Sequence, residues 1–189
     1  MSKDRPIDPR TVATAALCRE GETLLGAWSL AQLPRLSAGL FDAPAADERV
    51  SWQARFGQDT PVGSAPQPWL ELEARTHVTL QCQRCLQALQ EPLTMQRRFL
   101  FVGSEAEAEA LDADSDDDHL VLTPRLDLQL LVEDELILEL PLVPRHEGVC
   151  PEPLPFPGAS GAADGADEPA DERPNPFAAL AALRKPGGT

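Results

Sequence analysis

The chain has 189 residues, of which 42% are hydrophobic, and its formal net charge of -15 gives a pI near 4.5. This length and apolar content suffice for one packed domain with additional segments. The strong acidity argues against a general polyanion binder, because nucleic-acid affinity rests mainly on lysine and arginine, and it favours a basic protein partner.

The sequence also indicates where the protein works. No apolar segment stands behind the charges of the first residues, so no secretory signal is expected. No apolar run approaches the roughly 18 residues that a membrane helix needs. Four cysteines do not form a dense disulfide framework. We therefore expect a cytoplasmic protein with reduced thiols and no membrane contact.

The first forty residues predict two helices separated by a strand. The first helix is expected to begin at Asp8 and Pro9 and to end at Gly21, because these residue types favour such positions. A short apolar run over residues 22–28 predicts a strand. Ser29 is then expected to cap a second helix through residue 40, with Pro34 as a kink or a delayed start.

Three longer segments alternate between apolar and polar side chains. This period of two predicts half-buried strands over residues 49–57, 69–81 and 93–102. Arg97 shares the parity of the apolar side chains in its strand, which allows a bulge or a strand end there. The predicted fold class is α+β, an antiparallel sheet with helices packed on it.

The second half of the domain begins with a strongly acidic stretch. Residues 104–118 contain eight acidic and no basic residues, which predicts a disordered, solvated insertion. Residues 119–122 predict a short strand, and Asp127 is expected to cap a helix that reaches about Glu139. The carboxylates at 133–135 are interpreted as a polar helix face, because neither a nucleophile nor a phosphate-binding loop accompanies them.

The C-terminal region changes composition. The predicted domain covers residues 1–150, and residues 151–174 are rich in Pro, Ala, Gly and acidic residues, which predicts a flexible linker. Residues 175–185 predict a docking helix. An isolated helix this short is marginal in water, so it is expected to fold against its own domain or a partner. Its apolar edge consists of Phe177, Leu180 and Leu183.

Cysteine spacing gives the clearest candidate site. Cys82 and Cys85 form a Cys-x-x-Cys pair between two predicted strands, and two thiolates at this spacing can hold one tetrahedral metal ion from a single turn. His146 and Cys150 supply a candidate second half. The four residues predict one structural zinc site of three thiolates and an imidazole. The alternative is that the cysteines are reduced, structural and free of metal.

Three blocks of sequence together resemble one protein family. They are residues 78–86 (VTLQCQRCL), 131–146 (LVEDELILELPLVPRH) and 173–185 (RPNPFAALAALRK). The order and the residues of these blocks resemble those of the YceD family, the large ribosomal RNA subunit accumulation proteins of bacteria and chloroplasts. The resemblance runs from about residue 69 to residue 185, and the N-terminal third carries no signature of the family.

The resemblance implies a non-enzymatic factor in the synthesis, processing or stability of large-subunit (23S) ribosomal RNA, acting in ribosome assembly without a small-molecule substrate. Its partner would be a ribosomal protein or an assembly intermediate of the large subunit. Two versions remain open. The acidic body binds a basic ribosomal protein, or Arg84, Arg97 and Arg98 contact ribosomal RNA directly.

Two further interpretations belong to other classes of protein. One is a zinc-stabilised adaptor that binds a basic ribosomal protein without a direct role in ribosomal RNA. The other is a hydrolase or nuclease that uses the acidic cluster, for which the sequence offers no catalytic constellation.

Overall fold

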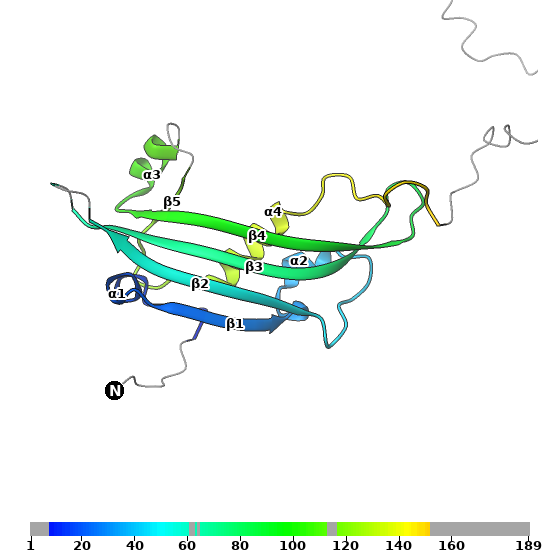
Figure 1. Cartoon of the computed structure of the whole chain (residues 1–189), viewed down its shortest axis with the longest axis horizontal. Coiled ribbons are helices and arrows are strands. Elements are labelled where there is room, and N and C mark those ends of the chain that lie inside the picture. The colour runs from blue at the N-terminus through cyan, green and yellow to red at the C-terminus, as the bar shows by residue number, and fades with distance from the viewer. Residues whose placement is uncertain (1–7, 61–62, 64, 113–116, 152–189) are drawn as a thin grey trace, which may run out of the picture. The chain divides into compact units, whose positions relative to one another are not determined.

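The computed structural model describes residues 8–60, 63, 65–112 and 117–151 of the chain. These residues contain a five-stranded sheet with the strand order β1-β2-β3-β4-β5 (Figure 1). The strands are β1 (Thr23–Ser29), β2 (Arg49–Asp59), β3 (Gln67–Gln81), β4 (Ala88–Val102) and β5 (Asp118–Val121). The helices are α1 (Thr14–Glu20), the 3-10 helix η1 (Leu30–Gln32), α2 (Pro34–Ala38), α3 (Glu105–Asp112) and α4 (Leu128–Leu138).

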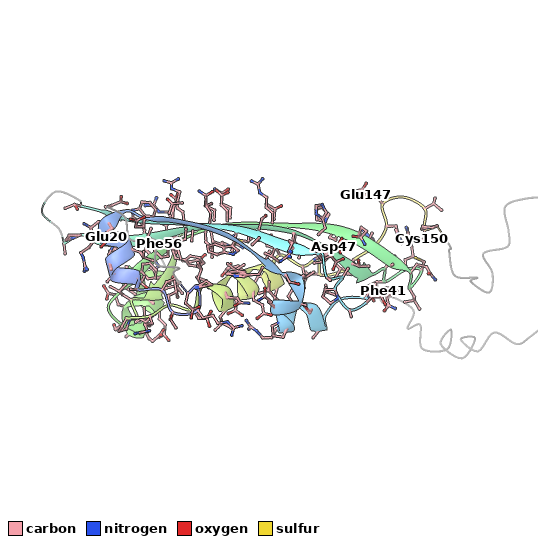
Figure 2. The ribbon with its side chains drawn as sticks, turned by 90° about the horizontal axis from the view of Figure 1, so that it is seen from below. Glu20, Phe41, Asp47, Phe56, Glu147 and Cys150 are labelled. Carbon is pink, nitrogen blue, oxygen red and sulfur yellow. The ribbon has the colours of Figure 1, made fainter. Side chains whose placement is uncertain are left out.

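The sheet is mostly antiparallel, as the sequence predicts. Strands β1 to β4 pair antiparallel with their neighbours, and β5 joins the edge of β4 in parallel. Figure 2 shows the helices on one face of the sheet, while side chains stand free from the other face. The α+β fold class is therefore confirmed. The short strands β1 and β5 form the two edges of the sheet.

The core lies between the sheet and the helices. Alternate side chains of β2, β3 and β4 face the helices, because successive residues of a strand point to opposite faces. Helix α4 completes the core with three apolar side chains that are fully buried. The buried core includes Val50, Ala54, Leu70, Leu72, Val78, Met95, Leu128, Val132 and Leu136.

The first helix begins later than predicted. Helix α1 starts at Thr14, and Gly21 ends it in the left-handed conformation with a φ of 66°, as expected. Asp8 does not cap this helix, since its side chain accepts a hydrogen bond from the N–H of Arg10. The segment between them makes a short β-bridge in which Val12 pairs with Leu126. Asp side chains compete for nearby backbone N–H groups in this way.

The second predicted helix is divided at Pro34, where the sequence predicts a kink or a delayed start. Ser29 caps it as expected, but the cap belongs to the 3-10 helix η1. Pro34 then starts α2 after an extended Leu33, which has φ -111° and ψ 80°. Proline disfavours the helical conformation in the residue before it, so one continuous helix cannot form across Leu33.

The acidic segment 104–118, expected to be an irregular insertion, contains helix α3 over its first half. The Ser104 hydroxyl accepts a hydrogen bond from the N–H of Glu107, whose carboxylate in turn accepts from the N–H of Gly103. This reciprocal capping and the alternating alanines favour a helix despite the charge. Residues 113–116 lie outside the described residues.

Strand β4 continues through Arg97 without a bulge. The register of β4 with β3 is one-to-one across Leu72 and Arg97. Arg97 is tolerated on the helix-facing side because its guanidinium donates to Glu135 (3.2 Å) and Glu139 (3.1 Å) of α4. Burial raises the pKa of Glu135, and the contact with Arg97 offsets part of that effect.

Helix α4 also has its predicted cap, since Asp127 accepts a hydrogen bond from the N–H of Leu130. The carboxylate of Glu133, however, is buried rather than part of a solvated face. Its oxygens accept hydrogen bonds from the backbone N–H of Arg35 (2.7 Å) and Leu36 (3.2 Å) and from the Arg35 side chain (3.1 Å). Glu133 therefore caps α2 from outside and holds it against α4.

We expect the Glu133→Ala variant to lower the free energy of unfolding by about 2–4 kcal/mol, because it leaves buried N–H groups without a partner. The matched control is Asp134→Ala, since Asp134 contacts the same arginine at the surface. Its effect should stay below about 1 kcal/mol. Urea unfolding of both variants measures the difference, and equal effects would contradict the assigned role of Glu133.

Candidate metal centre

The turn between β3 and β4 carries the Cys-x-x-Cys pair, as predicted. Cys82 begins the turn, and its N–H donates to the carbonyl of Gln87 (2.9 Å), while the N–H of Leu86 donates back to the carbonyl of Cys82 (2.8 Å). Leu86 has a φ of 62°, a conformation that costs a residue other than glycine about 1–2 kcal/mol. This tight turn brings Cys82 and Cys85 to one side.

The loop after α4 provides the second half of the site. Figure 2 shows this loop, with Glu147 and Cys150 labelled, beside the end of the sheet that carries the turn. Hydrogen bonds from Gln83 N–H to the Pro144 carbonyl (2.8 Å) and between the His146 ring and the Ala88 carbonyl (3.1 Å) attach it to the hairpin. Two segments about sixty residues apart thus meet at one place.

The four residues predicted as metal ligands gather in one cluster. The ligand atoms of Cys82, Cys85, His146 and Cys150 all lie within 4.8 Å of one another. The sulfurs of Cys82 and Cys150 are 3.9 Å apart, and the Cys85 sulfur is 3.5 Å from Nδ1 of His146. Neighbouring ligands of a tetrahedral zinc ion lie about 3.3–3.8 Å apart, given the usual bond lengths. The donor set therefore fits one tetrahedral ion.

The cluster is buried and separate from the main core. Cys82 and Cys85 are fully buried, Cys150 is 4% exposed, and the partly buried Leu89 packs against them. The buried side chains here are the cysteines themselves, so little apolar packing holds the loop to the hairpin at this end of the protein. Such an arrangement is typical of sites in which a metal ion supplies the missing contacts.

Histidine and thiol chemistry favour metal binding at this cluster. The Ala88 carbonyl can only accept a hydrogen bond, so Nε2 of His146 donates to it and Nδ1 is the ring nitrogen that faces the Cys85 sulfur. Burial alone would raise the pKa of Cys82, but backbone N–H groups, led by those of Arg84 and His146, lower that pKa to about 5. The thiolate is the form that binds metal.

Arg84, predicted as an RNA contact, lies within this cluster. Its Nε donates to the Cys150 sulfur (2.9 Å), and its terminal nitrogen donates to the carbonyls of His146 (3.1 Å) and Gly148. The hydrogen bond with Cys150 raises the pKa of Arg84. The sequence analysis did not predict that Arg84 supports the cluster. Its position between the two cysteines is the sequence feature that could have indicated this role.

The structure does not bring the predicted RNA contacts together. Arg84 braces the cluster, Arg97 pairs with carboxylates of α4, and Arg98 lies on the opposite face of β4 with an ion pair to Asp59 at 2.8 Å. The predicted helix edge, made of Phe177, Leu180 and Leu183, lies outside the described residues. No helix in the part of the chain that the structure describes is long and apolar enough to cross a membrane.

The fold and the cluster define a class of protein: a sheet covered by helices on one face, with a Cys3His cluster at one end of its central hairpin. Comparison with known families matches residues 70–184 to the family described as large ribosomal RNA subunit accumulation protein YceD. The match covers more than half of the chain and includes all four cluster residues, so the chain belongs to the YceD family. No solved structure matches the chain.

The sulfur geometry can be tested without metal. Mild oxidation of chelator-treated protein should link two of Cys82, Cys85 and Cys150 within one chain, because their sulfurs lie within 4.8 Å of one another. Cys18 is the internal control, since it is buried elsewhere in the main core. Peptide mapping by mass spectrometry identifies the linked pair. Three reduced cysteines, or links formed between chains alone, would contradict this geometry.

Proposed function

We propose that this protein promotes the accumulation of large-subunit ribosomal RNA as a non-enzymatic factor in ribosome assembly. The observation that supports the proposal is the YceD family match, whose description names large ribosomal RNA subunit accumulation. The match spans β4, α4, the cysteine cluster and nearly all of β3, which are the parts that hold the described domain together.

The charge of the chain supports a basic ribosomal protein as its partner. With 31 acidic residues against 16 basic ones, the protein attracts cationic surfaces over distances comparable to the Debye length. Two of the predicted RNA-contact arginines, Arg84 and Arg97, are engaged with cluster atoms and with α4. An adaptor that binds the basic protein without any direct effect on ribosomal RNA is the second candidate, and the same charge balance supports it.

We also propose that the Cys3His cluster binds one structural zinc ion. Cys82 and Cys85 from the hairpin and His146 and Cys150 from the loop would hold it, and the ion would join the loop after α4 to the sheet. Four protein ligands leave no open position, which is the arrangement of structural rather than catalytic zinc sites. Because the cluster lacks apolar packing, bound zinc should contribute several kcal/mol to folding.

The zinc proposal predicts about one zinc per chain in protein purified without chelator or polyhistidine tag. Cys150→Ser should lose most of this zinc and lower the melting temperature, while Cys18→Ser should keep its zinc near the wild-type value. Metal affinity should fall as the pH drops, because protons compete for the thiolates and the imidazole. Elemental analysis and thermal unfolding test these outcomes. Well under one zinc per chain, with unchanged stability after chelation, would contradict the zinc proposal.

The assembly role predicts a specific defect in cells. Deletion of the gene should lower large-subunit ribosomal RNA relative to small-subunit RNA and deplete the large subunit in sucrose gradients. The wild-type gene should restore both quantities. Equal RNA ratios and a normal subunit profile in the deletion strain would contradict the assembly role, whereas lost large subunits with normal RNA levels would favour the adaptor.

A further inference from the structure

The face of the sheet opposite the helices differs in charge from the chain as a whole. The strand alternation places arginines of β2, β3 and β4 on this face, and fewer carboxylates accompany them. The arginines are Arg49, Arg55, Arg75 and Arg98, and the carboxylates are Asp59, Glu71 and Glu73. In a protein with about twice as many acidic as basic residues, this open face is the part suited to a polyanion.

A tryptophan lies among these charges. Trp69 of β3 is paired with Gly57 of β2, and a Cβ atom on Gly57 would come within 2.3 Å of the Trp69 ring. The ring therefore lies over the backbone of the neighbouring strand, where the missing side chain leaves room for it. Its Nε1 donates to Asp59 at 3.1 Å. The other two tryptophans, Trp28 and Trp52, stack on each other in the core.

Two arginines flank this ring. The guanidinium carbons of Arg98 and Arg55 lie 5.4 and 5.9 Å from the Trp69 ring centroid. Arg98 pairs with Asp59 at 2.8 Å and Arg55 with Glu71 at 3.1 Å, and the partners in both pairs are substantially exposed. Exposed ion pairs contribute little free energy in water, so phosphate groups can replace these carboxylates at small cost.

We propose that this open face binds a short single-stranded segment of RNA, with an unpaired base stacked at Trp69 and phosphates bound by Arg55 and Arg98. An aromatic ring and guanidinium groups on an open sheet are the chemistry by which proteins hold unpaired bases. The proposal rests on the assembly role for the RNA class of the ligand. Of the three arginines that the sequence suggested as RNA contacts, only Arg98 belongs to this surface, where Trp69 and Arg55 accompany it.

The size and charge of the surface set its properties. From Trp69 to Arg75 the strand spans about 20 Å, which accommodates a few nucleotides of extended chain. Double-stranded RNA does not offer its bases for stacking, so the face should prefer single strands. The net charge of -15 opposes binding, which should therefore be weak and fall steeply with salt.

Fluorescence anisotropy with a labelled single-stranded RNA of about twelve nucleotides, which is within the range of site sizes for such surfaces, tests the proposal. At low salt, Trp69→Ala should weaken binding about tenfold or more, while Trp69→Phe should retain most of it. The Arg55→Gln/Arg98→Gln double variant should weaken binding. It should also reduce the slope of log affinity against log salt concentration by about two, one for each lost phosphate contact. Arg125→Gln, an exposed control between β5 and α4, should change binding only slightly.

Intrinsic fluorescence separates stacking from a merely structural role. RNA should quench the emission of wild-type protein, and this quenching should disappear in Trp69→Phe while binding persists, because Trp28 and Trp52 remain in the core. Urea unfolding of each variant reports whether the fold is intact. Unchanged affinity in a folded Trp69→Ala variant, or equal affinity for duplex RNA, would overturn the proposal.

Complementation of the deletion strain keeps this inference distinct from the assembly role. If wild-type protein restores large-subunit RNA but binds no single-stranded RNA, the open-face inference fails and the assembly role stands. If the deletion itself leaves ribosomal RNA unchanged, the assembly role fails whatever the protein binds. If the Trp69→Ala variant no longer binds a basic ribosomal protein, and the wild-type protein binds no RNA, the face belongs to a protein partner and the inference is overturned.

Discussion

The long antiparallel pairing of β3 with β4 is the constraint on which the rest of the structure depends. The register runs without interruption from Trp69 opposite Leu100 to Gln81 opposite Ala88. A shift by one residue would exchange every side chain between the core and the solvent face. The pairing therefore decides at once which residues face the helices, which face the solvent and where the cysteine turn closes.

The adjacent residues Arg97 and Arg98 show what this register separates. Arg97 points to the helices and pairs with Glu135 and Glu139, so the partly exposed guanidinium is matched by one buried and one half-buried carboxylate of α4. Arg98 points to the other face and lies beside Trp69. Two residues with the same chemistry thus serve the packing of α4 in one case and the proposed RNA surface in the other.

The cysteine cluster lies at the end of the same hairpin, where the main core does not reach. The main core ends before the turn, and the loop that follows α4 has few apolar contacts of its own. Four ligand atoms in one place, together with the Arg84 hydrogen bonds, can join this loop to the sheet without a second core. Hydrogen bonds already attach the loop that leaves α4 to the hairpin at this point.

Much of this protein was determined by the sequence alone, because the signals involved are local. The alternation over 49–57 and 69–81, the cap at Asp127 and the Cys-x-x-Cys spacing depend on residues that are close in the chain, and the sequence also singled out His146 and Cys150 as partners. The roles of Glu133 and Arg97 and the position of Trp69 over Gly57 were decided by the tertiary structure. Most of these depend on partners from distant segments or on the neighbouring strand, and pairings of that kind follow from strand register and helix docking rather than from local pattern.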